Sequence, residues 1–135
     1  MSSSPIYQLA LSFVDDIGGA SARALIHHFG DPEFLFKAKR RELESIPGIG
    51  RKRATSILQS QALEKAESEL RWLEKSDIQF LWFQDSDYPR RLLECYDAPI
   101  VLFRRGKCDW NQSRVIAIVG TRNATDYGRY ITEKL

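Results

Sequence analysis

The feature that most constrains the fold of this chain is an internal repeat in its first half. Apolar residues and one glycine recur at an offset of 32 positions, as Leu11, Val14, Ile17, Gly18, Ala22, Leu25 and Ile26 and again as Leu43, Ile46, Ile49, Gly50, Ala54, Ile57 and Leu58. Such self-similarity indicates one supersecondary unit used twice. The three- and four-residue spacings around the glycine predict a short helix, a tight turn and a second helix in each unit.

The turn of the second unit, within ESIPGIGRKRA, resembles the helix-hairpin-helix motif. Pro47 ends the incoming helix because the residue before a proline is disfavoured in the helical region. Gly48 and Gly50 permit a positive φ angle and a close approach of the backbone. Two such units usually pack together, so we expect an all-α, sterile-alpha-motif-like tandem domain over residues 1–75, closed by a helix over residues 60–75.

The second hairpin is a candidate phosphate site. Unpaired N–H groups at the start of its second helix, together with the positive end of the helix dipole, suit a phosphate oxygen. Its surroundings are basic, since residues 37–53 contain seven Lys or Arg against two Glu. The possible phosphate contacts are two glycines and three cations: Gly48, Gly50, Arg51, Lys52 and Arg53.

Two observations favour a purely structural role for the hairpins. Units of this kind often serve only as packing elements, and basic residues near a turn are often simply solvated. In the first unit Asp15 and Asp16 occupy the positions of Pro47 and Gly48. Two carboxylates would repel a phosphate, so the first hairpin is the weaker candidate.

The overall composition excludes several classes of protein. The chain has 135 residues, 43% hydrophobic and 28% charged, with a net charge of +2, as in a soluble globular protein. No segment reaches the roughly 20 apolar residues that cross a bilayer, and the N-terminus lacks the cation of a secretory signal. Cys95 and Cys108 have neither metal-ligand nor disulfide spacing. We therefore expect a cytoplasmic protein without a metal, a cofactor or a membrane contact.

The second half of the chain, from residue 76 on, has a different pattern. Strand-like apolar runs and helical patterns alternate, with strands expected over residues 78–83, 100–106 and 114–120 and helices over residues 90–96 and 126–135. The run RVIAIVG is continuously apolar, which is typical of a buried strand in a parallel sheet. A buried strand, a glycine turn and a helix open a doubly wound sheet. We therefore assign residues 76–135 to the start of a Rossmann-like domain, and the whole chain to the α/β class.

The loop GTRNATDYG follows that strand and is the second candidate phosphate site. It is not the dinucleotide fingerprint, because Arg122 and Thr125 stand where the next two glycines would fall. Arginine makes paired, charge-assisted hydrogen bonds to phosphate. The residues that could bind a phosphodiester are Gly120, Thr121, Arg122, Asn123 and Thr125, with Thr125 also expected to cap the next helix. The alternative is that Arg122 is a surface arginine on a structural loop.

Two segments together carry a resemblance to a known family. DYPRRLLECYDAPIVLFRRG followed by VIAIVGTRNATDYGR resembles the DprA/Smf DNA-processing proteins of bacteria. The matching positions are Tyr88, Pro89, Leu92, Pro99, Leu102 and Gly106, then Ile118 to Arg122, then Tyr127 and Gly128. The helical first half is also similar to the N-terminal domain of that family.

The resemblance implies a non-enzymatic protein of natural transformation. Members bind single-stranded DNA, protect the incoming strand and load a RecA-type recombinase onto it. The arginine of their Gly-Ser/Thr-Arg loop, here Arg122, belongs to the DNA-binding pocket. Members are much longer than this chain, so we expect it to be an N-terminal part. The surface that forms a homodimer and the recombinase contact would then lie largely beyond Leu135.

Two other functions remain open from the sequence. A nucleotide-hydrolysing Rossmann-like enzyme would need a catalytic acid or base that this chain does not offer. Asp85 and Asp87 sit in turn-like sequence and are better explained as turn residues. A module for double-stranded DNA repair or interaction would use the helix-hairpin-helix units instead of the loop at Arg122.

Overall fold

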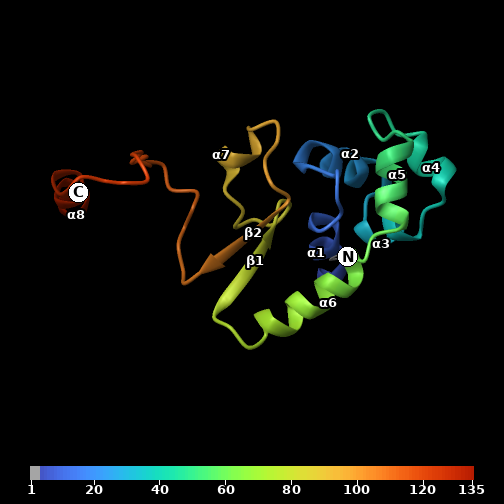
Figure 1. Cartoon of the computed structure of the whole chain (residues 1–135), viewed down its shortest axis with the longest axis horizontal. Helices are drawn as coiled ribbons and strands as arrows, with labels where there is room; N and C mark the ends of the chain where they lie inside the picture. The colour runs from blue at the N-terminus through green and yellow to red at the C-terminus, as the bar shows by residue number, and fades with distance from the viewer. Residues whose placement is uncertain (1–3) are drawn as a thin grey trace.

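The computed structural model describes residues 4–135 as an elongated molecule of helices around a small β-hairpin (Figure 1). Its helices are α1 (Pro5–Ser12), α2 (Gly19–Phe29), α3 (Pro32–Lys37), α4 (Arg40–Glu44), α5 (Arg51–Leu58), α6 (Ala62–Leu73), α7 (Arg90–Leu93) and α8 (Asp126–Lys134). Its strands are β1 (Ile78–Trp82) and β2 (Val101–Arg105). Helices α1 to α6 gather at one end, the strands and α7 lie in the middle, and α8 lies at the other end. No helix in this range is long and apolar enough to cross a bilayer.

The repeat forms the two helical hairpins that its spacing predicts. Helices α1 and α2 make the first hairpin, α4 and α5 make the second, and α3 connects them. Nearly all the repeated apolar positions are buried, because they lie on the sides of the helices that face a common core. The exceptions are Ile17, which is half-buried, and Leu58, which is 40% exposed. Helix α6 packs along α1 and closes the helical half.

The two hairpin turns share one backbone conformation despite different residues. Gly48 has a φ of 83°, and Asp16, at the equivalent position of the first unit, has a φ of 63°. Aspartate is among the few residues that enter this left-handed region readily. Of the two glycines that permit a positive φ in the second turn, Gly48 adopts it, whereas Gly50 has a φ of −78° and is the N-cap of α5.

Strands β1 and β2 form an antiparallel pair whose register runs from Ile78 opposite Arg105 to Trp82 opposite Val101. The pair packs on the helical half: Trp82 and Ile100 belong to the same buried cluster as the helical core. Between residues 4 and 135 this is the one sheet, with two strands. The parallel, doubly wound arrangement expected from the sequence is therefore not formed there. The domain boundary near residue 75 stays a prediction.

The first hairpin is joined to the second half of the chain through the start of α2. A Cβ atom added to Gly19 would lie 2.8 Å from the carbonyl carbon of Ala98, and closer still to its oxygen. The guanidinium of Arg23 donates hydrogen bonds to three carbonyls of the adjacent turn, those of Cys95, Tyr96 and Ala98. Positive charge and the amino end of a helix thus meet a cluster of carbonyl oxygens.

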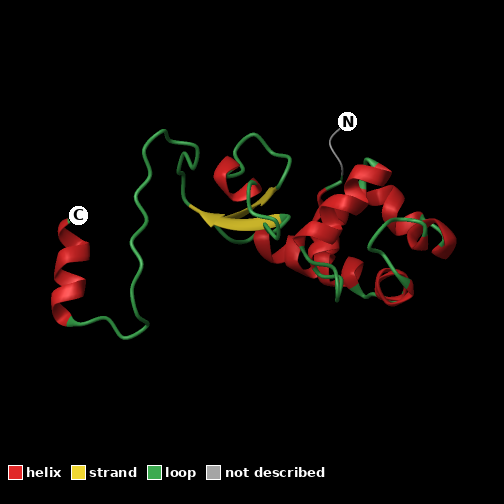
Figure 2. Ribbon diagram, turned by 90° about the horizontal axis from the view of Figure 1, so that it is seen from above, coloured by secondary structure: helices red, strands yellow, loops and turns green. Residues whose placement is uncertain are grey.

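The extended loop that leads to the C-terminal helix leaves the body of the molecule (Figure 2). Residues 114–120 form no strand, and Ile116 and Val119 are 87% and 91% exposed, so the prediction of a buried strand was wrong for this structure. The physical reason is that an isolated strand cannot pair its backbone groups, and β1 and β2 pair only with each other. The following helix, α8, forms as predicted, and the Thr125 hydroxyl caps it by accepting from the Gly128 amide.

Candidate nucleic-acid interface

The second hairpin presents the backbone donors that the motif predicts. Gly50 caps α5 without a side chain, and no acceptor within residues 4–135 pairs with the amides of Arg51, Lys52 and Arg53. Those amides point along the amino end of α5, where the helix dipole favours an anion. The geometry therefore suits a phosphate oxygen, and the contact itself stays a prediction.

Two of the three cations of this hairpin are held by the first hairpin. Lys52 Nζ lies 2.9 Å from Asp16 Oδ1. Arg53 donates from Nε to the Asp16 carbonyl at 3.1 Å and from Nη1 to the Gly48 carbonyl at 2.6 Å. Asp16 and Gly48 are equivalent positions of the repeat, so Arg53 ties the two turns together. The Asp16 carboxylate, which we expected to repel a phosphate, thus pairs with Lys52.

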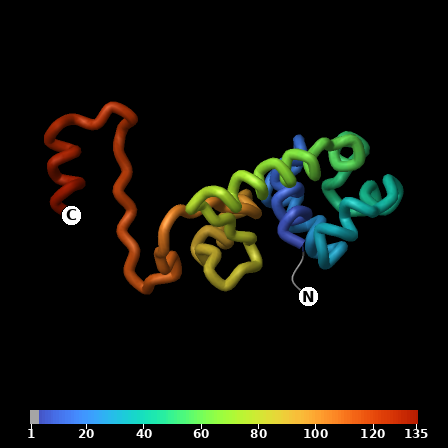
Figure 3. Tube along the Cα trace, turned by 90° about the horizontal axis from the view of Figure 1, so that it is seen from below, coloured from blue at the N-terminus to red at the C-terminus, as the bar shows by residue number. Residues whose placement is uncertain are grey.

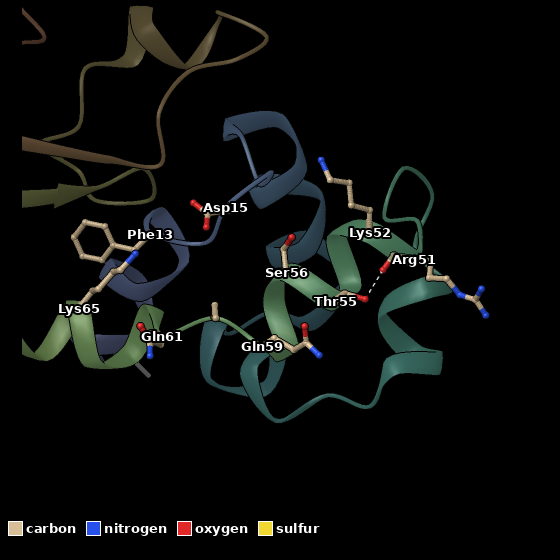
Figure 4. A pocket seen from close by; sticks show the side chains of 10 residues that line it. Phe13, Asp15, Arg51, Lys52, Thr55, Ser56, Gln59, Gln61 and Lys65 are labelled. Carbon is tan, nitrogen blue, oxygen red and sulfur yellow. Dashed lines mark hydrogen bonds between the residues drawn. The ribbon is translucent and has the colours of Figure 1, made fainter.

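Arg51 is the cation of this hairpin that is available to a ligand. It is exposed, and no carboxylate in the described part of the chain lies within ion-pair distance of it. A pocket of about 570 Å³ lies beside it, between α5 and the start of α6 (Figure 4). Lys52 and Lys65 line the same pocket, and Phe13 forms its apolar side. The structure thus places three cations and the Asp15 carboxylate around one hollow; of these cations, Arg51 and Lys52 were predicted from the sequence as phosphate contacts.

The pairing of Asp16 with Lys52 has a measurable consequence for pH. The hydrogen bond and charge of Lys52 lower the pKa of the Asp16 carboxyl below its ordinary value of 3.8. Because the folded-state pKa is the lower one, the pair stabilises the fold at neutral pH, and this contribution is lost as the pH falls through the folded-state pKa. We expect NMR titration of Lys52→Ala to move the pKa of Asp16 back toward 3.8, and Arg51→Ala to leave it unchanged. An unaltered pKa in Lys52→Ala would contradict the ion pair.

The second candidate site, at residues 120–125, lies on the exposed loop before α8. The Thr121 hydroxyl donates to the Asn123 carbonyl at 2.8 Å, which folds the loop back on itself. Gly120, Thr121 and Thr125 line a hollow of about 580 Å³ against α8. Arg122 and Asn123 do not line it, although both are exposed on the same loop. The structure therefore brings three of the five predicted residues together, and whether they bind phosphate stays a prediction.

Arg129 is a residue of this loop site that the sequence analysis did not select. It lies on the first turns of α8 and lines the same hollow, one helical turn before Glu133. The helix expected over residues 126–135 could have indicated Arg129. It lies four positions, or about one helical turn, after the cap residue Thr125 and therefore on the same side of the helix. Its backbone amide donates to the Thr125 carbonyl at 3.0 Å. Arg129 therefore adds a cation to the hollow, which Arg122 does not line.

The two candidate sites lie at opposite ends of the molecule (Figure 3). Helix α5 lies in the helical half, whereas the loop and α8 lie beyond the extended segment. A single short ligand cannot contact both in this arrangement. Each site must therefore be tested separately.

Tyr88 and Pro99 have a structural role. The buried Tyr88 hydroxyl donates to the Pro99 carbonyl, which fixes the turn between α7 and β2. Burial raises the pKa of the Tyr88 hydroxyl above its ordinary value of 10.0. This turn carries the carbonyls that accept from Arg23. The segment thus positions the second half of the chain on the first.

Nothing in residues 4–135 forms a cluster of three His, Cys, Asp or Glu side chains that could hold a metal. Both candidate sites offer backbone amides, hydroxyls and cations, which are groups that can bind an anion.

Comparison with known proteins matches both halves of the chain. A family model described as DNA recombination-mediator protein A matches residues 79–135. A second model, described as a SAM-like helix-hairpin-helix tandem, matches residues 9–61 and confirms the tandem predicted from the repeat. No solved structure matches the chain.

Two curated proteins show how far the similarity extends. Protein Smf of Synechocystis sp. is 33% identical over 133 residues, which is 96% of this chain and 33% of that protein. UvrABC system protein C of Salinispora arenicola is 37% identical over 62 residues, which is 46% of this chain and 9% of that protein. The chain thus spans about a third of the length of the Smf relative and less of the other.

Proposed function

Because this chain belongs to the DprA/Smf family of DNA-processing proteins, we propose that it binds single-stranded DNA by phosphate contacts at the loop of residues 120–125. The family resemblance inferred from the sequence is confirmed by the match to a recombination-mediator family and to Protein Smf.

The observation that carries the proposal is the exposed Gly-Thr-Arg loop at the amino end of α8. Arg122 is exposed, and no carboxylate in residues 4–135 pairs with it. An unpaired guanidinium beside a helix start favours a phosphate, which accepts paired hydrogen bonds from it. Thr121 adds a hydroxyl on the same loop.

The proposal extends to the rest of the family's activity. We infer that residues 76–135 begin a Rossmann-like domain in which the exposed apolar run of residues 114–120 becomes a paired strand. Its large exposed side chains, 61% for Val115 and 57% for Ile118, are those that a sheet would bury. In the cytoplasm, the complete homodimer would protect DNA taken up in natural transformation and load a RecA-type recombinase onto it.

Substitution of Arg122 tests the proposal. We expect Arg122→Ala to weaken the binding of a labelled oligo(dT) about tenfold, because a hydrogen-bonded charge is lost. The slope of log K against log salt should fall by about one phosphate contact. The measurement is fluorescence anisotropy across a salt series. Lys134→Ala is the matched control: it removes one exposed cation from the end of α8, away from the loop.

Three outcomes would contradict the proposal. Equal affinities and slopes for Arg122→Ala and Lys134→Ala would show that the loop does not hold the phosphate. Preference for a duplex over oligo(dT), lost on Arg51→Ala, would instead favour a double-stranded DNA module that uses the second hairpin. Hydrolysis of a nucleoside monophosphate by the chain would favour the enzyme alternative.

A further inference from the structure

A third hollow, of about 650 Å³, lies in the middle of the molecule and belongs to neither candidate site. Its walls come from both strands, from the turn before α7 and from the loop after β2. The residues that line it are mostly polar, with one large aromatic: Gln79, Ser86, Asp87, Arg90, Arg104, Lys107, Cys108, Asp109, Trp110 and Asn111. Neither the loop at Arg122 nor the hairpin at Arg51 contributes to it.

The walls of this hollow are held in place by hydrogen bonds. The Asn111 side chain accepts from the Arg90 amide at 2.9 Å and donates to the Tyr88 carbonyl at 3.1 Å. These two hydrogen bonds hold the loop after β2 against the start of α7. On the opposite wall, Arg104 donates to Gln79 at 3.1 Å and to Asp87 at 3.3 Å. The hollow is therefore preorganised by contacts between segments far apart in the sequence.

The charged side chains of this hollow are Arg90, Arg104 and Lys107 against Asp87 and Asp109, which leaves a net positive charge. Asp87 is paired with Arg104, and the Asp109 carboxylate accepts from the Asn111 amide and the Gln112 side chain. Arg90 and Lys107 have no carboxylate partner in the part of the chain that the structure describes. The hollow therefore holds two cations without a carboxylate partner and one carboxylate, Asp109, that only neutral donors contact, so its net charge stays positive. Such a site attracts an anion.

Trp110 gives the hollow a stacking surface. Its side chain is 44% exposed, and its ring stacks on no other aromatic ring among residues 4–135. A free indole beside two cations matches the two parts of a nucleotide, since bases stack on aromatic rings and Lys or Arg bind the phosphate. In a duplex the faces of the base are covered by its neighbours, so stacking here requires an unpaired base.

We propose that this hollow is a subsite for one nucleotide of single-stranded DNA, with the base on Trp110 and the adjacent phosphates at Arg90 and Lys107. This inference rests on the proposed function and adds a binding position to it. A strand held here would cross the β-hairpin, outside the loop at residues 120–125.

The intrinsic fluorescence of the chain tests the subsite directly. Of its three tryptophans, Trp82 is 2% exposed, Trp72 is 50% exposed on α6, and Trp110 lines the hollow. We expect oligo(dT) to quench the wild-type fluorescence and a duplex of equal length to quench it little. Trp110→Phe should abolish the quenching, and Trp110→Ala, which also removes the stacking ring, should weaken binding about tenfold. Trp72→Phe should keep both the quenching and the affinity. The double variant Arg90→Ala/Lys107→Ala should lower the salt slope by about two contacts. Arg71→Ala/Lys75→Ala, which removes two cations from the end of α6, should not.

The outcomes separate this inference from the proposed function. If oligo(dT) binds and Arg122→Ala weakens it, but Trp110→Phe retains the quenching, the subsite is wrong and the proposed function stands. If dTMP alone quenches Trp110 as tightly as oligo(dT) does, the hollow is a mononucleotide site and the inference is overturned. If oligo(dT) binds to neither the wild type nor any variant, both proposals fail.

Discussion

Gly19→Ser is expected to destabilise the protein by about 1–3 kcal/mol, the usual cost of forcing an atom into a filled site. The added Cβ would lie within 2.9 Å of the carbonyl oxygen of Asp97 and closer to that of Ala98. Both obstacles are backbone atoms in a turn fixed by Tyr88, so no side chain can swing aside. The serine would therefore push α2 away from the second half of the chain.

Gly18→Ser is the matched control for this experiment, because it places the same side chain one residue earlier. Gly18 has an extended backbone, with a φ of −84°, and a Cβ there would meet open space. Serine is a favoured helix N-cap, so we expect a change within about 0.5 kcal/mol, or a gain. The measurement is urea unfolding followed by far-UV circular dichroism. Equal stabilities for the two variants would show that α2 does not meet the turn at residues 95–98 in solution.

This contact also explains a difference between the two repeat units. At an offset of 32, Gly19 corresponds to Arg51. In the second unit the start of the helix is open, and its arginine is exposed. In the first unit the same position lies against Ala98, and only glycine fits there. The first hairpin therefore packs against the second half of the chain, whereas the start of α5 in the second hairpin is open to a ligand.

The helical half could be predicted from the sequence because its signal is local. Apolar residues at helical spacing fix which side of each helix is buried, and the repeat shows that one arrangement occurs twice. The same argument found β1, β2 and α8, whose ends agree with the sequence to within two residues. It also found the Thr125 cap, since a cap depends on neighbours in the sequence.

The features that the sequence could not supply depend on residues distant in the chain. The run at residues 114–120 has the composition of a buried strand, but a strand also needs a partner, and no local pattern shows whether one is present. Two further contacts also join residues that are far apart in the sequence. They are the ion pair of Asp16 with Lys52 and the hydrogen bond from Arg23 to the turn before β2. In the hollow at Trp110, contributions from both strands and two loops meet only after folding.

Trp82→Ala is expected to cost about 3–5 kcal/mol, the largest effect of a single substitution that we predict for this chain. Trp82 lies on β1 yet is 2% exposed within the cluster that forms the core of the helical half. Its indole N–H donates to Gln84 at 3.1 Å, so the ring is anchored at both its apolar and its polar side. A loss of this size is a large fraction of the stability of an ordinary domain.

The same variant tests whether residues 1–75 and the β-hairpin unfold together. Since Trp82 and Ile100 complete the helical core, we expect one cooperative transition in urea, shifted as a whole by Trp82→Ala, when the helices are followed by far-UV circular dichroism. Trp72→Ala is the control, because this side chain is half-exposed on α6 and its loss should cost below about 1 kcal/mol. If the helical signal of Trp82→Ala unfolded at the wild-type urea concentration, the helical half would be an independent domain, and the shared core would contribute nothing to its stability.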